Sequence, residues 1–150
     1  MTHYIRSSYM YPFFLFYDGL VSLAVARERN QCKVMTDHAE ETITLLTKKS
    51  EIFPANYLNK VYLLRAERAV TLGNYSEVME LYNKAISLSK KYGFQHEEAL
   101  AFERAGMFLL QRNDVDEAYQ SLLQSYYSYE VWGKLNHITF NHATDRFKLI

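Results

Sequence analysis

Two stretches decide the fold: Gly73-Asn74-Tyr75-Ser76-Glu77-Val78, at residues 73–78, and Asn113-Asp114-Val115-Asp116-Glu117-Ala118, at residues 113–118. They align at an offset of 40 residues (113 − 73), and Tyr92-Gly93 aligns with Trp132-Gly133 at the same offset. Apolar or small residues also recur at this offset in the pairs Tyr62 and Phe102, Ala66 and Gly106, Ala69 and Leu109, Tyr82 and Leu122, and Ala85 and Ser125. A fixed period of this length is the signature of a repeat architecture.

Within each repeat the apolar residues advance by three or four positions, which indicates two amphipathic helices. The first series is Leu58, Val61, Tyr62, Ala66, Ala69 and Leu72, and the second is Val78, Leu81, Tyr82, Ala85 and Leu88. Asn74 and Asp114 each stand three residues before a glutamate, which predicts helix starts with capping boxes at 74 and 114. Gly93 and Gly133 are expected to close helices in the left-handed conformation.

A degenerate copy of the pattern lies upstream, and Ile52-Phe53-Pro54 separates it from the next hairpin because proline disfavours helix in the residue before it. The sequence therefore predicts a single all-α domain over residues 1–150, a right-handed solenoid of antiparallel helix hairpins with about seven helices. The expected repeats are residues 13–52, 53–92 and 93–132, followed by a terminal helix at 134–149 that covers the open end.

The large and small positions of this pattern resemble those of the tetratricopeptide repeat. They are Tyr62, Ala66, Ala69, Val78, Tyr82 and Ala85, and again Phe102, Ala105, Gly106, Leu109, Ala118, Leu122 and Ser125. The chain departs from that family in its period, which exceeds the usual ~34 residues, in Arg65, which stands where leucine is expected, and in the missing terminal proline. Longer second helices would absorb the additional residues.

Several segments carry a closer resemblance: Asn56-Tyr57, Ala66-Glu67, Leu81 to Ile86, Gly93-Phe94, Glu97 to Ala101, and Tyr129 through Lys134. With them, residues 14–147 resemble the helical-repeat region of large bacterial and fungal signalling proteins. Those proteins join a kinase-like domain, an AAA-type ATPase, the repeat region, a GAF domain and a histidine kinase. The resemblance implies a fragment or relative of a signal-transduction protein that carries the spacer and not the chemistry.

Seventeen basic and seventeen acidic residues cancel, so no global field favours nucleic acid or an anionic membrane surface. The single cysteine, Cys32, forms no internal disulfide, and a cytoplasmic location is expected.

The apolar run Pro12 to Ala26 raises two alternatives, a secretory signal and a membrane span. Asp18, Gly19 and Ser22 interrupt it, and it is shorter than the roughly 20 residues that a bilayer requires.

Signals for catalysis are weak, so we expect no enzyme activity, no cofactor and no metal. The sequence contains no phosphate-binding loop, His-Glu-x-x-His or Cys-x-x-Cys motif. The candidates weighed against a structural role are Cys32 with His38 as nucleophile and base, His137, His142 and Asp145 as metal ligands, Glu97, Glu98 and Glu103 as an acid cluster, and Tyr126-Tyr127-Ser128-Tyr129 as base-stacking residues. Positive charge is missing around the tyrosines, so nucleic-acid binding is not expected.

Function is expected on the concave face that the first helix of each hairpin forms. The family's groove positions correspond here to Lys60, Leu63, Glu67, Val70 and Thr71, and then to Leu100, Glu103, Met107, Leu110 and Gln111. The basic clamp that binds chaperone C-termini in some relatives is absent, so those tails are not the expected ligand.

Three hypotheses remain for the function. The first is a protein-interaction or spacer module that binds a protein, a peptide or neighbouring domains of the same polypeptide. The second is a regulatory segment of a larger ATPase or histidine kinase, which a reading frame extending beyond both ends would favour. The third is a homo-oligomer built through exposed ends of the solenoid.

Overall fold

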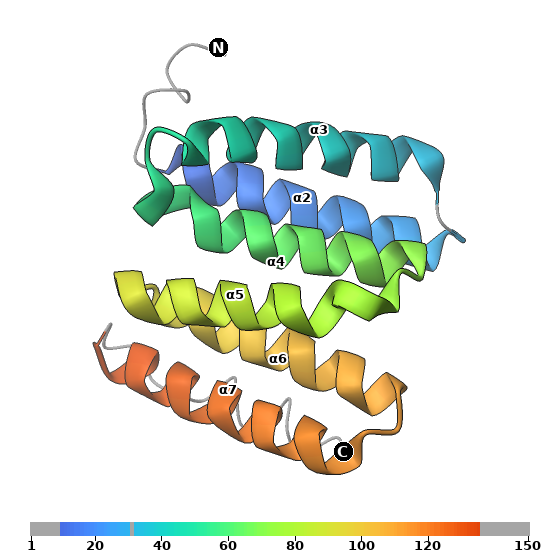
Figure 1. Cartoon of the computed structure of the whole chain (residues 1–150). Coiled ribbons are helices and arrows are strands. Elements are labelled where there is room, and N and C mark those ends of the chain that lie inside the picture. Colours follow the sequence, from blue (N-terminus) through green and yellow to red (C-terminus); the bar gives the residue numbers. More distant parts are fainter. Residues whose placement is uncertain (1–9, 31, 136–150) are drawn as a thin grey trace. The chain divides into compact units, whose positions relative to one another are not determined.

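The computed structural model describes residues 10–30 and 32–135 (Figure 1). Within these ranges the chain forms six α-helices and one short 3-10 helix, with no strand. The prediction of an all-α fold is therefore confirmed for the described part of the chain. The seventh helix expected at 134–149 falls almost wholly outside the described residues, and the right-handed solenoid stays a prediction. The chain divides into two compact units, unit 1 ending at Tyr92 and unit 2 beginning at Gly93.

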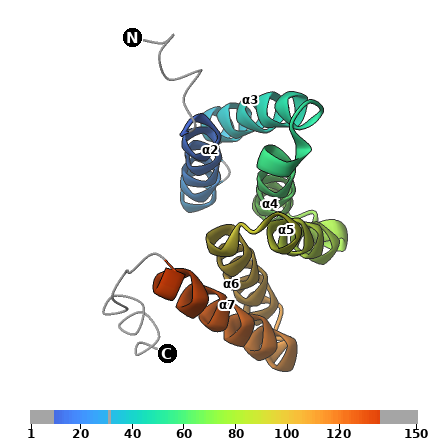
Figure 2. The same cartoon turned by 90° about the vertical axis from the view of Figure 1, so that its left-hand side faces the viewer.

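Unit 1 is built around α4. Its helices are α2 (Tyr11–Glu28), α3 (Lys33–Ser50), α4 (Pro54–Leu72) and α5 (Val78–Tyr92), with the 3-10 helix η1 (Tyr75–Glu77) before α5. Helix α4 contacts α2, α3 and α5, and Figure 2 shows α2, α3 and α4 from one end, lying beside one another. A Cβ at Gly19 of α2 would lie 3.0 Å from the side chain of Leu64 on α4, so glycine permits the close approach of these two helices.

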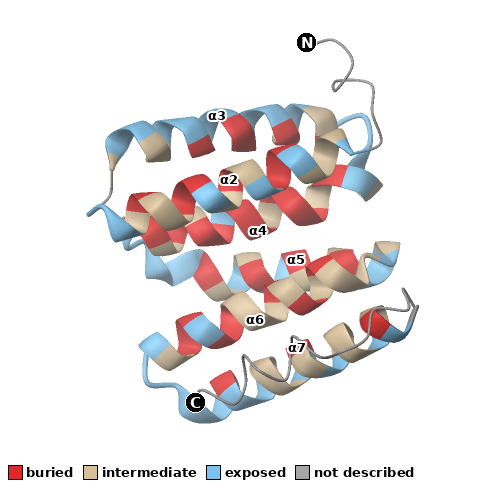
Figure 3. Ribbon diagram, turned by 180° about the vertical axis from the view of Figure 1, so that it is seen from behind, coloured by how far each residue is buried: buried red, intermediate tan, exposed pale blue. Residues whose placement is uncertain are grey.

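The core of unit 1 follows the apolar spacing of the sequence. Its fully buried side chains include Phe16, Leu23, Leu46, Val61, Leu63, Leu64, Val78 and Tyr82. Figure 3 shows that the outward side of α3 is largely exposed. That side carries Lys33, Asp37, Glu40, Glu41 and Lys48, which is the usual composition of a solvated helix face. The apolar face of α3 is therefore buried, and its charged side chains remain in solvent.

Unit 2 is a hairpin of α6 (Gln95–Gln111) and α7 (Val115–Leu135) in its described part. The helices approach each other closely at Gly106, where an added Cβ would lie 2.7 Å from Leu122 Cγ. Ser125 is buried on α7, and its hydroxyl donates to the carbonyl oxygen of Ala99 on α6 at 2.9 Å. Small residues at the contact therefore allow the two backbones to pack tightly.

The turns that close α4 and α6 share one backbone geometry at the predicted offset. Gly73 and Asn113 both have positive φ, 77° and 62°. The following amides donate back to the carbonyl five residues earlier, Asn74 to Ala69 at 2.9 Å and Asp114 to Leu109 at 3.0 Å. These 6→1 bonds are those of a Schellman motif, which satisfies carbonyls at a helix C-terminus.

Two local predictions were wrong. Asn74 makes no side-chain capping bond, because the chain first forms the 3-10 turn η1 and α5 begins only at Val78. Gly133 does not end a helix, since α7 runs through it to Leu135. Gly93 does adopt the left-handed conformation after α5, with φ of 76°. The aligned Gly93 and Gly133 therefore serve different purposes, a turn at one and the interior of a long helix at the other.

Candidate interaction surfaces

The groove positions predicted on α4 are covered in the structure. Lys60, Leu63, Glu67 and Thr71 are each less than 5% exposed, and Val70 is half-buried. Helix α2 lies against this face: the Lys60 ammonium stands 4.9 Å from the centre of the Phe13 ring, a cation–π contact. These side chains therefore contribute to the interior of unit 1 and offer a partner little accessible surface.

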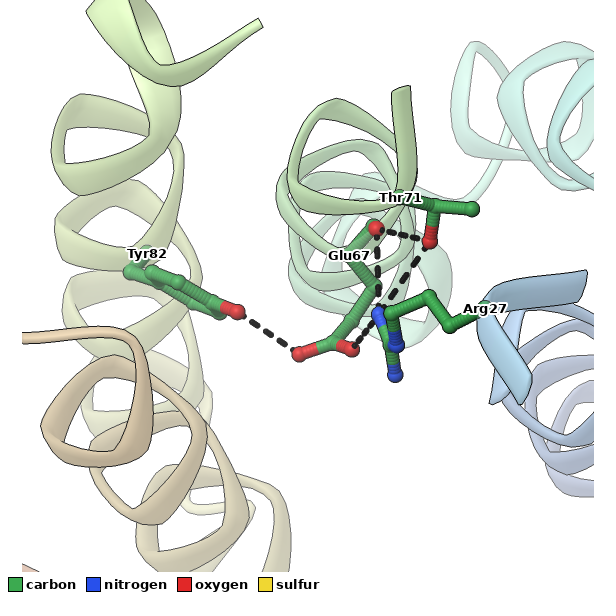
Figure 4. Close-up of polar contacts among 4 residues, drawn as sticks. All are labelled: Arg27, Glu67, Thr71 and Tyr82. Atoms are coloured by element: carbon green, nitrogen blue, oxygen red, sulfur yellow. Dashed lines mark hydrogen bonds and ion pairs between the residues drawn. The ribbon is translucent and has the colours of Figure 1, made fainter. Parts of the chain in front are cut away.

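Glu67 is the centre of a buried polar network that joins α2, α4 and α5 (Figure 4). Its carboxylate is 2.8 Å from Arg27 Nη1 on α2, and it accepts a 2.7 Å hydrogen bond from the Tyr82 hydroxyl on α5. Arg27 Nη1 also donates to the Glu67 carbonyl oxygen at 3.3 Å and to Thr71 Oγ1 at 3.2 Å. The Glu67 side chain is 1% exposed and that of Arg27 is 26% exposed. The partly exposed guanidinium therefore neutralises the buried Glu67 carboxylate.

On α6 the corresponding positions remain partly open. Met107 is 41% exposed, Gln111 is exposed, and Leu100, Glu103 and Leu110 are half-buried. At about 100° per residue these five positions lie within roughly 100° of the helix circumference, so they form one face. We call this set of five residues the α6 face.

The α4 and α6 faces differ because different residues occupy positions that align at the offset of 40. Glu67 aligns with Met107 and Tyr82 with Leu122, so unit 2 has apolar side chains at both positions of the buried Glu67–Tyr82 bond. A methionine at the surface is flexible and polarizable, which suits a surface that adapts to a partner. At the position of the buried Glu67, the α6 face therefore carries an apolar, exposed side chain.

An aromatic cluster lies beside Glu103 in unit 2. The Tyr129 hydroxyl of α7 donates to Glu103 Oε2 at 2.9 Å, which fixes this carboxylate on the α6 face. The His96 ring packs against Trp132 and Tyr129, with centroid distances of 4.7 and 5.8 Å. Burial lowers the pKa of His96, and the carboxylates of Glu97 and Glu103 oppose this effect. The cluster therefore favours neutral His96 and holds α6 and α7 together near one end.

Sequence reasoning missed an exposed apolar face on α2. Met10, Phe14, Tyr17 and Val21 are between 40% and 62% exposed, and the small residue Ala24 follows, half-buried. Their spacing of four, three, four and three residues could have identified this face, because it is the spacing of a coiled-coil seam. We call these five residues the α2 seam.

The remaining chemical candidates take ordinary positions where the structure describes them. His38 Nε2 lies 2.8 Å from Asp18 Oδ2, at the surface between α3 and α2, and Cys32 is half-buried before α3. His137, His142 and Asp145 lie outside the described residues. Among residues 10–30 and 32–135, no group of three His, Cys, Asp or Glu side chains is placed to hold a metal ion. The helices in these ranges include none with the length and hydropathy of a membrane span.

Comparisons with known protein families, curated proteins and solved structures found no match to this chain. The resemblance to tetratricopeptide repeats and to the repeat region of signalling ATPases and kinases therefore stays a prediction from sequence.

Proposed function

We propose that this chain is a non-catalytic interaction or spacer module whose α6 face binds a segment of protein. The observation that carries the proposal is the contrast between α4 and α6 at aligned positions. Lys60, Glu67 and Thr71 are buried within unit 1, whereas Met107 at the centre of the α6 face is 41% exposed. The binding partner is a peptide or protein segment, from another chain or from a neighbouring domain of the same polypeptide.

The composition of the α6 face favours an apolar segment without acidic residues. Leu100, Met107 and Leu110 supply apolar contact area, and removing such area from water favours association. Glu103 is held in place by the Tyr129 hydroxyl, so an acidic side chain on the partner would meet a fixed negative charge. Apolar contact would give affinity and Glu103 would give selectivity.

The test compares proteins captured from the source cell lysate by the full chain and by Met107→Glu. Met107 is substantially exposed, so the substitution should leave the fold intact and place a charge at the centre of the α6 face. Tyr119→Glu is the matched control, because Tyr119 of α7 is 62% exposed and lies outside the face. We expect specific partners to be lost with Met107→Glu and retained with Tyr119→Glu. An identical set of captured proteins for all three chains would refute the role of the α6 face.

A further inference from the structure

The solvent side of α2 has a composition unlike that of its neighbour α3. The outer face of α3 carries lysines, aspartate and glutamates, whereas the α2 seam consists of aliphatic and aromatic side chains. At about 100° per residue, the five seam residues fall within roughly 80° of the helix circumference, so they form a straight stripe. Phe13 and Val25, also apolar, border it on either side. A stripe of this kind is the surface that a helix presents to another helix.

The spacing of the seam residues indicates which kind of partner can pack against them. Apolar residues at alternating steps of four and three place side chains in the a and d positions of a heptad, where each fits between four residues of a facing helix. No charged residue stands in the seam between Met10 and Ala24. Asp18, at its border, is already engaged with His38 at 2.8 Å. The partner must therefore be a helix with an apolar heptad seam of its own, because a charged helix would lose hydration without compensation.

We propose that the α2 seam is the interface of a homodimer, in which α2 packs antiparallel against α2 of a second copy. A second copy matches the seam in spacing and length, and none of its five seam residues is charged. One antiparallel register places Phe14 opposite Ala24, a large side chain against a small one, and Tyr17 opposite Val21. The same register puts Glu28, an exposed residue one step beyond the seam, beside Met10 at the end of the stripe and not opposite the Glu28 of the other copy. A parallel pair would place the two Glu28 carboxylates side by side and align the two helix dipoles unfavourably.

The available area predicts a weak, reversible dimer. Four large side chains at about half exposure, with Ala24 and the half-buried neighbours, offer roughly 500 Å² per copy, taking about 150–250 Å² for each fully exposed aromatic ring. Two copies would bury about 1,000 Å², the lower limit for a specific interface. The dissociation constant of the dimer should be on the order of micromolar or higher, so dilution below it gives monomers. The α2 seam and the α6 face share no residue, so either inference can fail without the other.

Sedimentation equilibrium of the full chain, from about 1 μM to about 1 mM, tests the proposal across the range expected for a weak interface. We expect reversible dimerisation of the wild type. Phe14→Lys combined with Val21→Lys should raise the dissociation constant on the order of tenfold or more. Val34→Lys combined with Ile52→Lys is the matched control, since these residues of unit 1 are 68% and 71% exposed and lie outside the seam. The control should dimerise as the wild type does.

Far-UV circular dichroism and the thermal midpoint establish that each variant is folded. Phe14→Gln with Val21→Gln provides an uncharged version and should also weaken the dimer. A wild type that stays monomeric over the whole range would overturn the proposal, whether the seam is then covered by another part of the chain or by a different protein. Equal weakening by the seam variant and the control would overturn it as well, because the effect would then come from added charge alone.

Discussion

The hydrogen bond from Tyr82 to Glu67 should make a large contribution to the stability of unit 1. Tyr82 is 1% exposed, and its hydroxyl donates to Glu67 Oε1 at 2.7 Å. Tyr82→Phe keeps the ring and removes the donor to a buried carboxylate. A hydrogen bond to a charged group contributes about 1.5–3 kcal/mol, so we expect unfolding free energy to fall by about 2 kcal/mol. For a chain of this size the thermal midpoint should fall by roughly 4–8 °C.

Urea unfolding followed by far-UV circular dichroism measures this loss. Tyr119→Phe is the control: Tyr119 is 62% exposed, so its change should stay within about 0.5 kcal/mol. Arg27→Met separates the ion pair from the hydrogen bond, and the double variant with Tyr82→Phe shows whether the two interactions are coupled through Glu67. If Tyr82→Phe unfolds at the same urea concentration as the wild type, the buried hydrogen bond does not have the role assigned to it.

Three further predictions concern single positions. Gly106→Ala should lower the unfolding free energy by about 1 kcal/mol in urea titrations, because the new methyl group would overlap Leu122. Helix propensity alone predicts a gain of about the same size. A measured increase in unfolding free energy would therefore contradict the tight contact at Gly106. Gly73→Ala should cost about 1–2 kcal/mol through its positive φ alone, since nothing lies within 4 Å of the added Cβ, whereas Gly73→Asn should cost clearly less. Burial lowers the pKa of His96 below its ordinary 6.5, so the unfolded chain takes up the proton first, and stability should fall as pH drops through 6.5 and the folded-state value. Replacing His96 with Gln should flatten the pH dependence of the thermal midpoint; an unchanged profile would refute this assignment.

Most of the local structure of the described residues could be predicted from the sequence. The break at Pro54 and the left-handed Gly93 lie where the pattern placed them. These features depend on residues close in sequence, whose backbone preferences act locally. The errors were also local: a 3-10 turn replaced the cap at Asn74, and α7 continued through Gly133. A glycine permits a left-handed turn without imposing one, so Gly133 alone could not determine the end of α7.

The accessibility of the predicted groove could not be read from periodicity. Spacing correctly places Lys60, Glu67 and Thr71 on one side of a helix, but the same spacing describes a face open to solvent and a face covered by another helix. Contacts from Arg27 and Phe13 on α2 show that this face of α4 is covered. Helix α2 itself is apolar on nearly all sides, so its pattern did not identify which face would pack inward.

The buried charge in unit 1 also explains why aligned residues serve different purposes in the two units. Burying Glu67 in an apolar interior is unfavourable unless both Arg27 and Tyr82 reach it, so the network forms only in one arrangement of α2, α4 and α5. With Met107 and Leu122 at the aligned positions, unit 2 lacks this pair of carboxylate and hydroxyl: Leu122 packs beside Gly106 of α6, and Met107 is 41% exposed. The exchange of the buried Glu67 for the exposed and flexible Met107 is therefore the physical basis for proposing that recognition takes place at the α6 face.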